Sequence, residues 1–153
     1  MTDALGWRKK FGVLAPSTNT IVEPDFYAMR VPGVTAHFSR IHIRNQNLGS
    51  DKDFENLLAE IRVEINYAID RVMTCEPDYM VMGMSAETFW DGMEGNRLFK
   101  TRVTERAGGL DVATGAEACE KALGLFGAKR IGVVTPYQPI GDRSVVRFFN
   151  DIG

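Results

Sequence analysis

Residues 12–20 have the sequence GVLAPSTNT, in which an apolar run passes directly into a turn of small hydrogen-bonding residues. A short apolar run bounded by turn residues is typical of a buried parallel strand. Asn19 or Thr20 can cap the helix that we expect to follow. In open α/β sheets, ligands collect at the carboxyl ends of strands, where loop hydroxyls and helix amides converge. The stretch therefore predicts an α/β fold with ligand-binding groups after its first strand.

The same arrangement recurs twice later in the chain. Residues 80–85 have the sequence MVMGMS, and residues 131–137 have the sequence IGVVTPY. Each is an apolar run that ends in polar or turn-forming residues. Three polar strand ends together predict a site for a small anionic molecule.

Composition limits the class of protein. The 153 residues are 44% hydrophobic and 25% charged, which is ordinary for one globular domain with a real core. The net charge of −2 gives no argument for nucleic acid or an anionic membrane surface. No apolar run approaches the roughly 20 residues that span a bilayer. Residues 1–10 lack the apolar core of a secretory signal, so we expect a cytoplasmic protein without a nucleic-acid or membrane partner.

The cysteines and histidines do not indicate a metal site. Cys75 and Cys119 have neither metal-ligand spacing nor the pattern of a disulfide framework, and we expect both to be buried as small apolar residues. His37 and His42 are five positions apart in a predicted strand, so they point to opposite faces. We predict no metal and no cofactor.

Strand and helix patterns alternate along the chain, which predicts a parallel sheet flanked by helices. Helical spacing of apolar residues is clearest between Phe54 and Val72. Ser50 or Asp51 can cap this helix and Asp142 the last one, while Gly127 can end the helix before it. Strands are predicted at residues 11–15, 34–43, 79–84, 111–114 and 130–134, and helices at 20–29, 51–75, 94–106, 116–126 and 142–152.

The last predicted strand and helix would leave apolar faces without packing partners. A strand at residues 130–134 followed by one helix is half of a βαβ unit, with no strand left to complete it. We therefore expect this chain to be the front part of a longer protein.

The order of the motifs resembles the aspartate/glutamate racemase superfamily, in the branch of maleate cis–trans isomerase and arylmalonate decarboxylase. The resemblance covers essentially the whole chain and rests on GVLAPSTNT at 12–20, GMSA at 83–86, FWDG at 89–92, ATGA at 113–116, LFGAKRI at 125–131 and VTPY at 134–137. It implies two similar racemase-like, Rossmann-type α/β lobes that face each other across an active-site cleft. On that template residues 1–114 form the first lobe. Residues 115–153 form the crossing helix and the first βα unit of an incomplete second lobe.

The resemblance also implies a cofactor-independent reaction at the carbon beside a carboxylate. Preorganised hydrogen-bond donors stabilise an enediolate-like anion, and a cysteine of suitable pKa moves the proton or adds as a thiolate. We therefore predict an isomerase or decarboxylase that acts on a small dicarboxylate resembling maleate or an arylmalonate. A small carboxylate is the predicted partner, and a homo-oligomer is compatible with the sequence.

Several site residues follow from the resemblance. Asn19 matches a residue that binds a substrate carboxylate, although helix capping explains an asparagine there equally well. Ser17 is a similar donor for which turn formation is the simpler explanation. Tyr137 matches a tyrosine whose phenol donates to the substrate carboxylate. Its place after Pro136, at the end of a predicted strand, favours the site over the core.

Gly83 matters most for the type of reaction. It matches the first-lobe cysteine of racemases and isomerases, where the decarboxylase has glycine, and Met84 stands where the decarboxylase has threonine. Ser85 and the backbone N–H groups of residues 83–86 can hold a carboxylate. We expect Glu87 to be a solvated loop charge. Aromatic residues at 89–90 can wall the pocket or, as we favour, pack beneath it.

Neither Cys75 nor Cys119 can replace the missing cysteine, because one precedes its strand and the other lies on a helix. A second-lobe cysteine would lie beyond Gly153, so we expect this chain alone to be inactive. An alternative is a non-catalytic carboxylate-binding protein on the same scaffold, with a role in ectoine utilisation. A flavodoxin-like nucleotide-binding domain is disfavoured, because neither G-x-G-x-x-G nor a P-loop follows any predicted strand.

Overall fold

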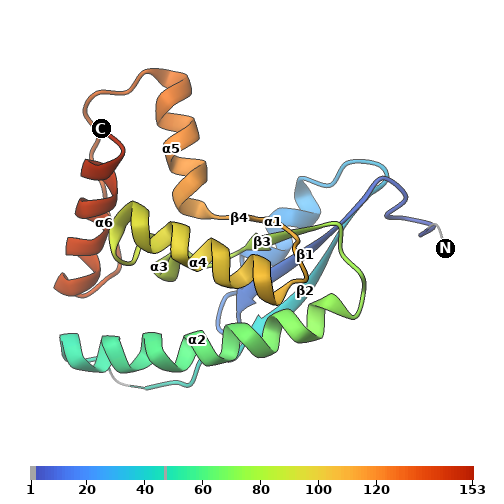
Figure 1. Ribbon diagram of the computed structural model, residues 1–153, viewed down its shortest axis with the longest axis horizontal. Helices are drawn as coiled ribbons and strands as arrows, with labels where there is room; N and C mark the ends of the chain where they lie inside the picture. Colours follow the sequence, from blue (N-terminus) through green and yellow to red (C-terminus); the bar gives the residue numbers. More distant parts are fainter. Residues whose placement is uncertain (1–2, 47) are drawn as a thin grey trace.

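The computed structural model describes residues 3–46 and 48–153 of the chain. It is an α/β fold built on a four-stranded parallel sheet with strand order β2-β1-β3-β4, which confirms the predicted fold class (Figure 1). The elements are β1 (Lys9–Pro16), α1 (Val22–Ala28), β2 (Val34–Ile41), α2 (Asp51–Met73), β3 (Tyr79–Met82), α3 (Ala86–Phe89), α4 (Gly92–Arg106), β4 (Val112–Ala113), α5 (Gly115–Phe126) and α6 (Pro139–Asp151).

β1 is the central strand of the sheet. It pairs with β2 from Lys9 opposite Val34 to Pro16 opposite Ile41, and with β3 over four further residue pairs. Val13, Leu14 and Ala15 are completely buried. A strand buried on both faces needs the continuous apolar run that predicted it, and this burial confirms the first strand.

The long helix α2 covers one face of the sheet, and the first strands contact it directly (Figure 1). Its apolar face carries buried residues at helical spacing, and Ser50 caps it by accepting a hydrogen bond from the Asp53 N–H at 3.2 Å. α4 packs beside α2 and adds Phe99 and Val103 to the same core. The predicted α2 and its cap are therefore confirmed.

Several helix starts differ from the prediction, including α1, which begins at Val22 rather than residue 20, and α5, which begins at Gly115 rather than residue 116. A short helix, α3, precedes α4, and α4 begins at Gly92 rather than residue 94. α6 begins at Pro139, because proline already has the backbone angle of a first helical residue. Asp142 therefore lies inside the first turn instead of capping the helix, and its carboxylate accepts a hydrogen bond from the Thr135 hydroxyl.

The strand predicted at residues 130–134 is not formed. The segment runs without regular secondary structure between α5 and α6, and its apolar side chains Ile131, Val133 and Val134 are exposed. A strand exists only where its backbone groups pair with a neighbour, and no strand among the described residues lies beside it. The division into a first lobe at 1–114 and the beginning of a second at 115–153 stays a prediction.

α5 ends as predicted, at Gly127, which adopts the left-handed conformation with φ of 59°. The helix begins with the Thr114 hydroxyl accepting a hydrogen bond from the Glu117 N–H. Among the described residues, no helix is both long and apolar enough to cross a membrane.

The core under α2 sets the stability of the fold. Leu58, in the first half of α2, is 2% exposed, so replacing it with alanine leaves a cavity. We expect Leu58→Ala to lower the free energy of unfolding by about 2–5 kcal/mol in urea denaturation. Val63→Ala is the matched control on the same helix, because Val63 is 53% exposed and its truncation leaves no cavity. Equal losses in the two variants would contradict this description of the core.

Candidate functional site

The predicted site residues lie where strands β1 and β3 end. β1 ends at Pro16, directly before Ser17, and β3 ends at Met82, directly before Gly83. Both strands are parallel and adjacent, so their carboxyl ends lie at one edge of the sheet. This edge, with the turn at residues 17–22 and the loop at 83–85, is called the carboxyl edge below.

The turn after β1 is held by its own polar groups. The Ser17 hydroxyl accepts a hydrogen bond from the Ile43 N–H at 2.9 Å, which ties the turn to the residues after β2. The Asn19 carbonyl oxygen accepts from the N–H groups of Ile21 and Val22 at 2.9 and 2.8 Å. Asn19 thus accepts from the two N–H groups at the start of α1, but the N-cap position itself is Ile21, not Asn19 or Thr20 as predicted. The Asn19 amide nitrogen has no hydrogen-bond partner among the described residues and is left to donate to a ligand.

Arg40 on β2 holds this turn in place through hydrogen bonds and an ion pair. Its guanidinium donates to the Asn19 backbone carbonyl at 2.8 Å and to that of Pro16 at 3.3 Å. It also forms an ion pair with Glu23 of α1. Sequence reasoning missed Arg40, because only the register of β2 beside β1 brings residue 40 to the end of β1.

Gly83 lies too close to its neighbours for a side chain. Its N–H donates to the Leu14 carbonyl at 2.7 Å. A Cβ atom there would lie 2.9 Å from Val22 Cγ1 and 3.0 Å from the Leu14 carbonyl oxygen. The glycine therefore allows the end of β3 to pack against β1 and α1. Val22, whose N–H donates to Asn19, is therefore the side chain that lies beside Gly83.

Ser85 and Tyr137 meet at the carboxyl edge, although 52 residues separate them. Their hydroxyl oxygens are 2.5 Å apart, so one donates to the other. Tyr137 is half-buried and its ring packs against Phe54 with a centroid distance of 6.2 Å, which aims the phenol toward the loop at residues 83–85. Met84 is half-buried against the main core and supplies an apolar side chain rather than a donor.

Glu87 is not a solvated loop charge, and this prediction was wrong. The side chain is 2% exposed and both carboxylate oxygens accept from Arg62 Nε at 3.0 Å. Arg102 on α4 is a second cation, 3.7 Å away. A buried carboxylate needs such partners, because desolvation without them is costly. Glu87 thus faces the two arginines of α2 and α4 and ties α3 to both helices.

The aromatic residues after Glu87 pack rather than line the carboxyl edge, as we favoured. The Phe89 ring lies edge-on to Phe148 with centroids 4.9 Å apart, and Trp90 packs against Phe54 at 5.9 Å. These contacts fasten α3 to α6 and α2. They give the loop at residues 83–85 a rigid base.

Neither cysteine lies in the turn or loop of the carboxyl edge, and both are half-buried rather than buried as predicted. Burial raises the pKa of the half-buried Cys75 thiol, and the nearby charge of Lys10 offsets this only in part. Burial likewise raises the pKa of Cys119. Cys75 precedes β3, and its Sγ contacts the Val72 carbonyl at 3.1 Å. Neither thiol has the lowered pKa of a reactive cysteine.

No group of three or more metal-ligating side chains forms among residues 3–46 and 48–153. His37 instead bonds the Thr35 hydroxyl, with 2.9 Å between His37 Nε2 and Thr35 Oγ1.

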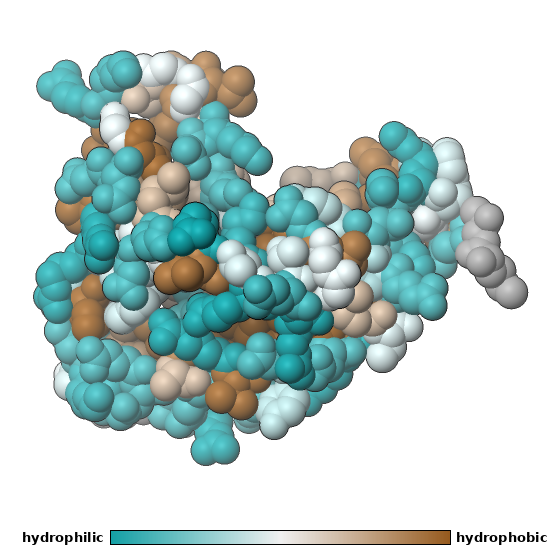
Figure 2. Space-filling view, viewed as in Figure 1, coloured by the Kyte–Doolittle hydropathy of each residue, from teal (hydrophilic) through white to brown (hydrophobic). Residues whose placement is uncertain are grey.

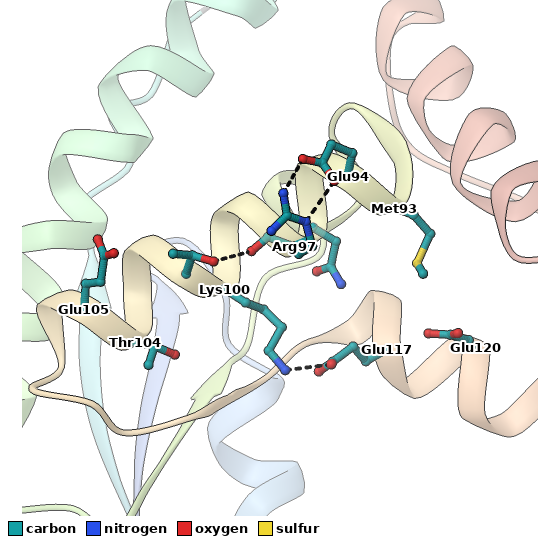
Figure 3. Close-up of a pocket in the computed structure, with 10 residues that line it drawn as sticks. Met93, Glu94, Arg97, Lys100, Thr104, Glu105, Glu117 and Glu120 are labelled. Carbon is teal, nitrogen blue, oxygen red and sulfur yellow. Dashed lines mark hydrogen bonds and ion pairs between the residues drawn. The ribbon is translucent and has the colours of Figure 1, made fainter.

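A groove of about 570 Å³ lies between α4 and α5 and contains none of the predicted site residues (Figure 3). Its charges are mostly neutralised in pairs. Lys100 contacts Glu117 at 2.6 Å and Asp111 at 3.3 Å, and Arg97 contacts Glu94. Although partial burial favours the neutral amine, these carboxylates outweigh it and raise the pKa of Lys100. Charges already satisfied in this way do not make a site for a small anion.

Comparison with known proteins supports the fold. No protein-family model matches the sequence, and no curated protein does. The structure is similar to Nocardia farcinica maleate cis-trans isomerase bound to Tris, with a TM-score of 0.76 and 19% identity over 93% of this chain and 58% of that one. For a maleate isomerase from Pseudomonas putida with maleate, the TM-score is 0.77, with 21% identity over 95% of this chain and 60% of that one.

An arylmalonate decarboxylase is also similar, with a TM-score of 0.65 and 15% identity over 93% of this chain and 57% of that one. The chain thus spans less than two thirds of the length of each of these structures. The resemblance to this racemase-like branch is confirmed as a shared fold.

Glu87 is expected to matter for stability through its arginine partners. Glu87→Gln keeps the shape but leaves Arg62 and Arg102 without a buried counter-charge, so we expect a loss of about 2–4 kcal/mol in the free energy of unfolding. Glu94→Gln is the control, because Glu94 pairs with Arg97 at the surface, and it should change stability little. If Glu87→Gln were as stable as Glu94→Gln in urea denaturation, the contacts of Glu87 with its arginine partners would not stabilise the fold.

The raised pKa values of Cys75 and Cys119 predict that both thiols react slowly with disulfide reagents. Because a raised pKa reduces the thiolate fraction at neutral pH, both should react with Ellman's reagent at pH 7 more slowly than in the urea-unfolded chain. The rate should rise steeply as the pH approaches the thiol pKa. A fast phase at pH 7 in the folded chain, lost in Cys75→Ser or Cys119→Ser, would show an activated cysteine instead.

Proposed function

We propose that the carboxyl edge binds one carboxylate of a small dicarboxylate, in a cofactor-independent isomerase or decarboxylase. The observation that carries this proposal is the contact between the Ser85 and Tyr137 hydroxyls beside Gly83. Two hydroxyls held together by the fold can turn toward an anion that enters between them. Maleate and arylmalonates are the substrates named for the structures that share the fold.

The groups at the carboxyl edge suit an anion. The Asn19 amide nitrogen and the Ser85 and Tyr137 hydroxyls are neutral donors that fixed contacts hold in place. Donors preorganised in this way stabilise a carboxylate and the enediolate-like charge that forms beside it. Glu87 of α3, which follows the loop at residues 83–85, is engaged by Arg62 and Arg102, so its charge is neutralised.

We propose that the acid or base of the reaction lies outside these 153 residues. Gly83 offers no side chain, and both thiols lie elsewhere with raised pKa values. On this proposal residues 115–153 begin a second lobe that would carry the missing group. The chain alone then binds the dicarboxylate without turning it over.

A non-catalytic carboxylate-binding protein on this scaffold, with a role in ectoine utilisation, is the second candidate. The crowding at Gly83 is compatible with it, because no cysteine fits there without movement of Val22 or the β1 backbone, although a glycine also suits the decarboxylase interpretation. A longer chain that contains these residues would distinguish the two. Turnover of maleate or phenylmalonate supports the enzyme, and binding of both without turnover supports the binding protein.

Tyr137→Phe tests the site directly, because it removes only the phenol oxygen. Losing one hydrogen bond to a charged group costs about 1.5–3 kcal/mol, so maleate should bind the variant roughly 10-fold to 150-fold more weakly by calorimetry. Tyr79→Phe is the matched control, since the Tyr79 hydroxyl donates to Asp111, outside the carboxyl edge. Equal maleate affinity in wild type, Tyr137→Phe and Tyr79→Phe would rule out the proposed role of Tyr137.

A further inference from the structure

The phenol of Tyr137 is placed by the start of α6 rather than by a strand. Tyr137 lies two residues before Pro139, where α6 begins, and residues 128–136 before it have no regular secondary structure. No sheet partner among the described residues therefore fixes the tyrosine. Its hydroxyl oxygen nevertheless lies 2.5 Å from that of Ser85, so other contacts must hold the side chain in place.

Gly141, in the first turn of α6, lies directly against this tyrosine. Gly141 is buried, and a Cβ atom there would lie 2.7 Å from Tyr137 Cβ and 3.2 Å from Tyr137 Cγ. It would also lie 3.3 Å from Cε1 of Phe54, the ring against which Tyr137 packs. Because Cβ is fixed to the backbone, no rotation of the tyrosine side chain would relieve the shortest of these contacts. A methyl group at position 141 would therefore move the whole tyrosine.

The backbone conformation of Gly141 does not itself require a glycine. Unlike Gly92 and Gly127, Gly141 does not have a positive φ. Glycine within a helix is less favourable than alanine, because it loses more backbone entropy on folding. The space that Tyr137 occupies therefore explains why position 141 has no side chain.

Hydrogen bonds also fix the tyrosine backbone to α6. The Tyr137 N–H donates to Thr135 Oγ1 at 3.2 Å, and the Thr135 hydroxyl donates to the Asp142 carboxylate. Asp142 is the residue next to Gly141 in the same helical turn. The tyrosine is thus held against α6 by a polar link through Thr135 and by its close approach to Gly141.

The start of α6 is itself fastened to the beginning of α2. The Asp51 carboxylate accepts from the Ile140 N–H at 3.4 Å and from Arg143 at 3.1 Å. The Gln138 amide donates to the Leu48 carbonyl at 2.9 Å. The first turn of α6 is therefore a fixed base for the tyrosine that precedes it.

We propose that Gly141 and Thr135 are positioning residues for the carboxyl edge. Gly141 has no side chain and so lets Tyr137 lie against α6, while Thr135 fixes the tyrosine backbone, and together they set the phenol oxygen beside Ser85. The inference rests on the proposed function, in which these two hydroxyls bind a carboxylate. Because a hydrogen bond is lost when its atoms move apart by about 1 Å, a small displacement of Tyr137 removes the phenol from the site.

Maleate binding by Gly141→Ala tests the position of the phenol. We expect binding to weaken by about tenfold or more in calorimetry, as is expected for Tyr137→Phe. In the Tyr137→Phe background the same substitution should change the affinity little, because the phenol that it displaces is already absent. Gly124→Ala is the matched control and should leave the affinity unchanged, since Gly124 lies inside α5 with no atom within 4 Å of its Cβ position. In a wild-type chain that binds maleate, no loss in Gly141→Ala, or an equal loss with and without the Tyr137 phenol, would refute the inference.

A measurement without ligand separates this inference from the proposed function. Isotope labelling of the tyrosine Cζ atoms gives an NMR signal for each of the four tyrosines, and Tyr137→Phe identifies the signal of Tyr137. Ser85→Ala removes the hydrogen-bond partner and should shift this signal, and Gly141→Ala should shift it in the same direction. Gly124→Ala should not. A wild-type chain that does not bind maleate contradicts the proposed function, whereas an unshifted Tyr137 signal in Gly141→Ala overturns the positioning role.

Two further variants apply if Gly141→Ala alone does not fold. Tyr137→Gly removes the crowded Cβ atom, so adding Gly141→Ala to it should give a folded chain with a raised urea midpoint, as Gly124→Ala should do in wild type. Thr135→Val keeps the shape of the side chain but breaks the link between Tyr137 and Asp142, so it should shift the Tyr137 signal in a folded chain. A double variant that stays unfolded, or an unshifted signal in Thr135→Val, would contradict the proposed positioning.

Discussion

The structure depends on the burial of β1 between two parallel neighbours. Val13, Leu14 and Ala15 are completely buried, and their backbone groups are satisfied only by the strands on either side. Parallel pairing forces each connection to cross over the sheet, so every strand ends at the same edge. For that reason a turn after β1 and a loop after β3 come together at one place. The carboxyl edge is a consequence of this pairing.

Arginine ion pairs fix the two segments that form the carboxyl edge. Arg40 binds the turn that carries Asn19, through two backbone carbonyls and Glu23. Arg62 and Arg102 hold Glu87, which ties α3 and the loop before it to α2 and α4. Neither set of arginine contacts uses the Asn19 amide nitrogen or the Ser85 and Tyr137 hydroxyls. A preorganised anion site needs such supports, because its donors must be held in place by contacts other than those made to the ligand.

The chain has two apolar surfaces of different kinds. One is the sheet face beside α1, where Phe11, Val34 and Ala36 line a cavity that the seven-residue α1 does not fill. The other surface is the segment at residues 131–134 with the end of α5, where Leu125, Phe126 and Val134 are exposed (Figure 2 shows the apolar residues of the viewed face in brown). The first adjoins a formed strand with an open edge, whereas the second contains a predicted strand without a partner.

The fold class, the central strand, the long helix with its Ser50 cap and the end of α5 at Gly127 could all be predicted from the sequence. These features depend on local patterns of apolar, turn and capping residues, which are visible along the chain. The burial of Glu87, the bonds from Arg40 to the first turn and the lack of a partner strand for residues 130–134 among the described residues appear only in the folded structure. Each of these depends on which distant segment lies alongside, because burial, ion pairing and strand formation all need a partner in space that sequence spacing does not specify.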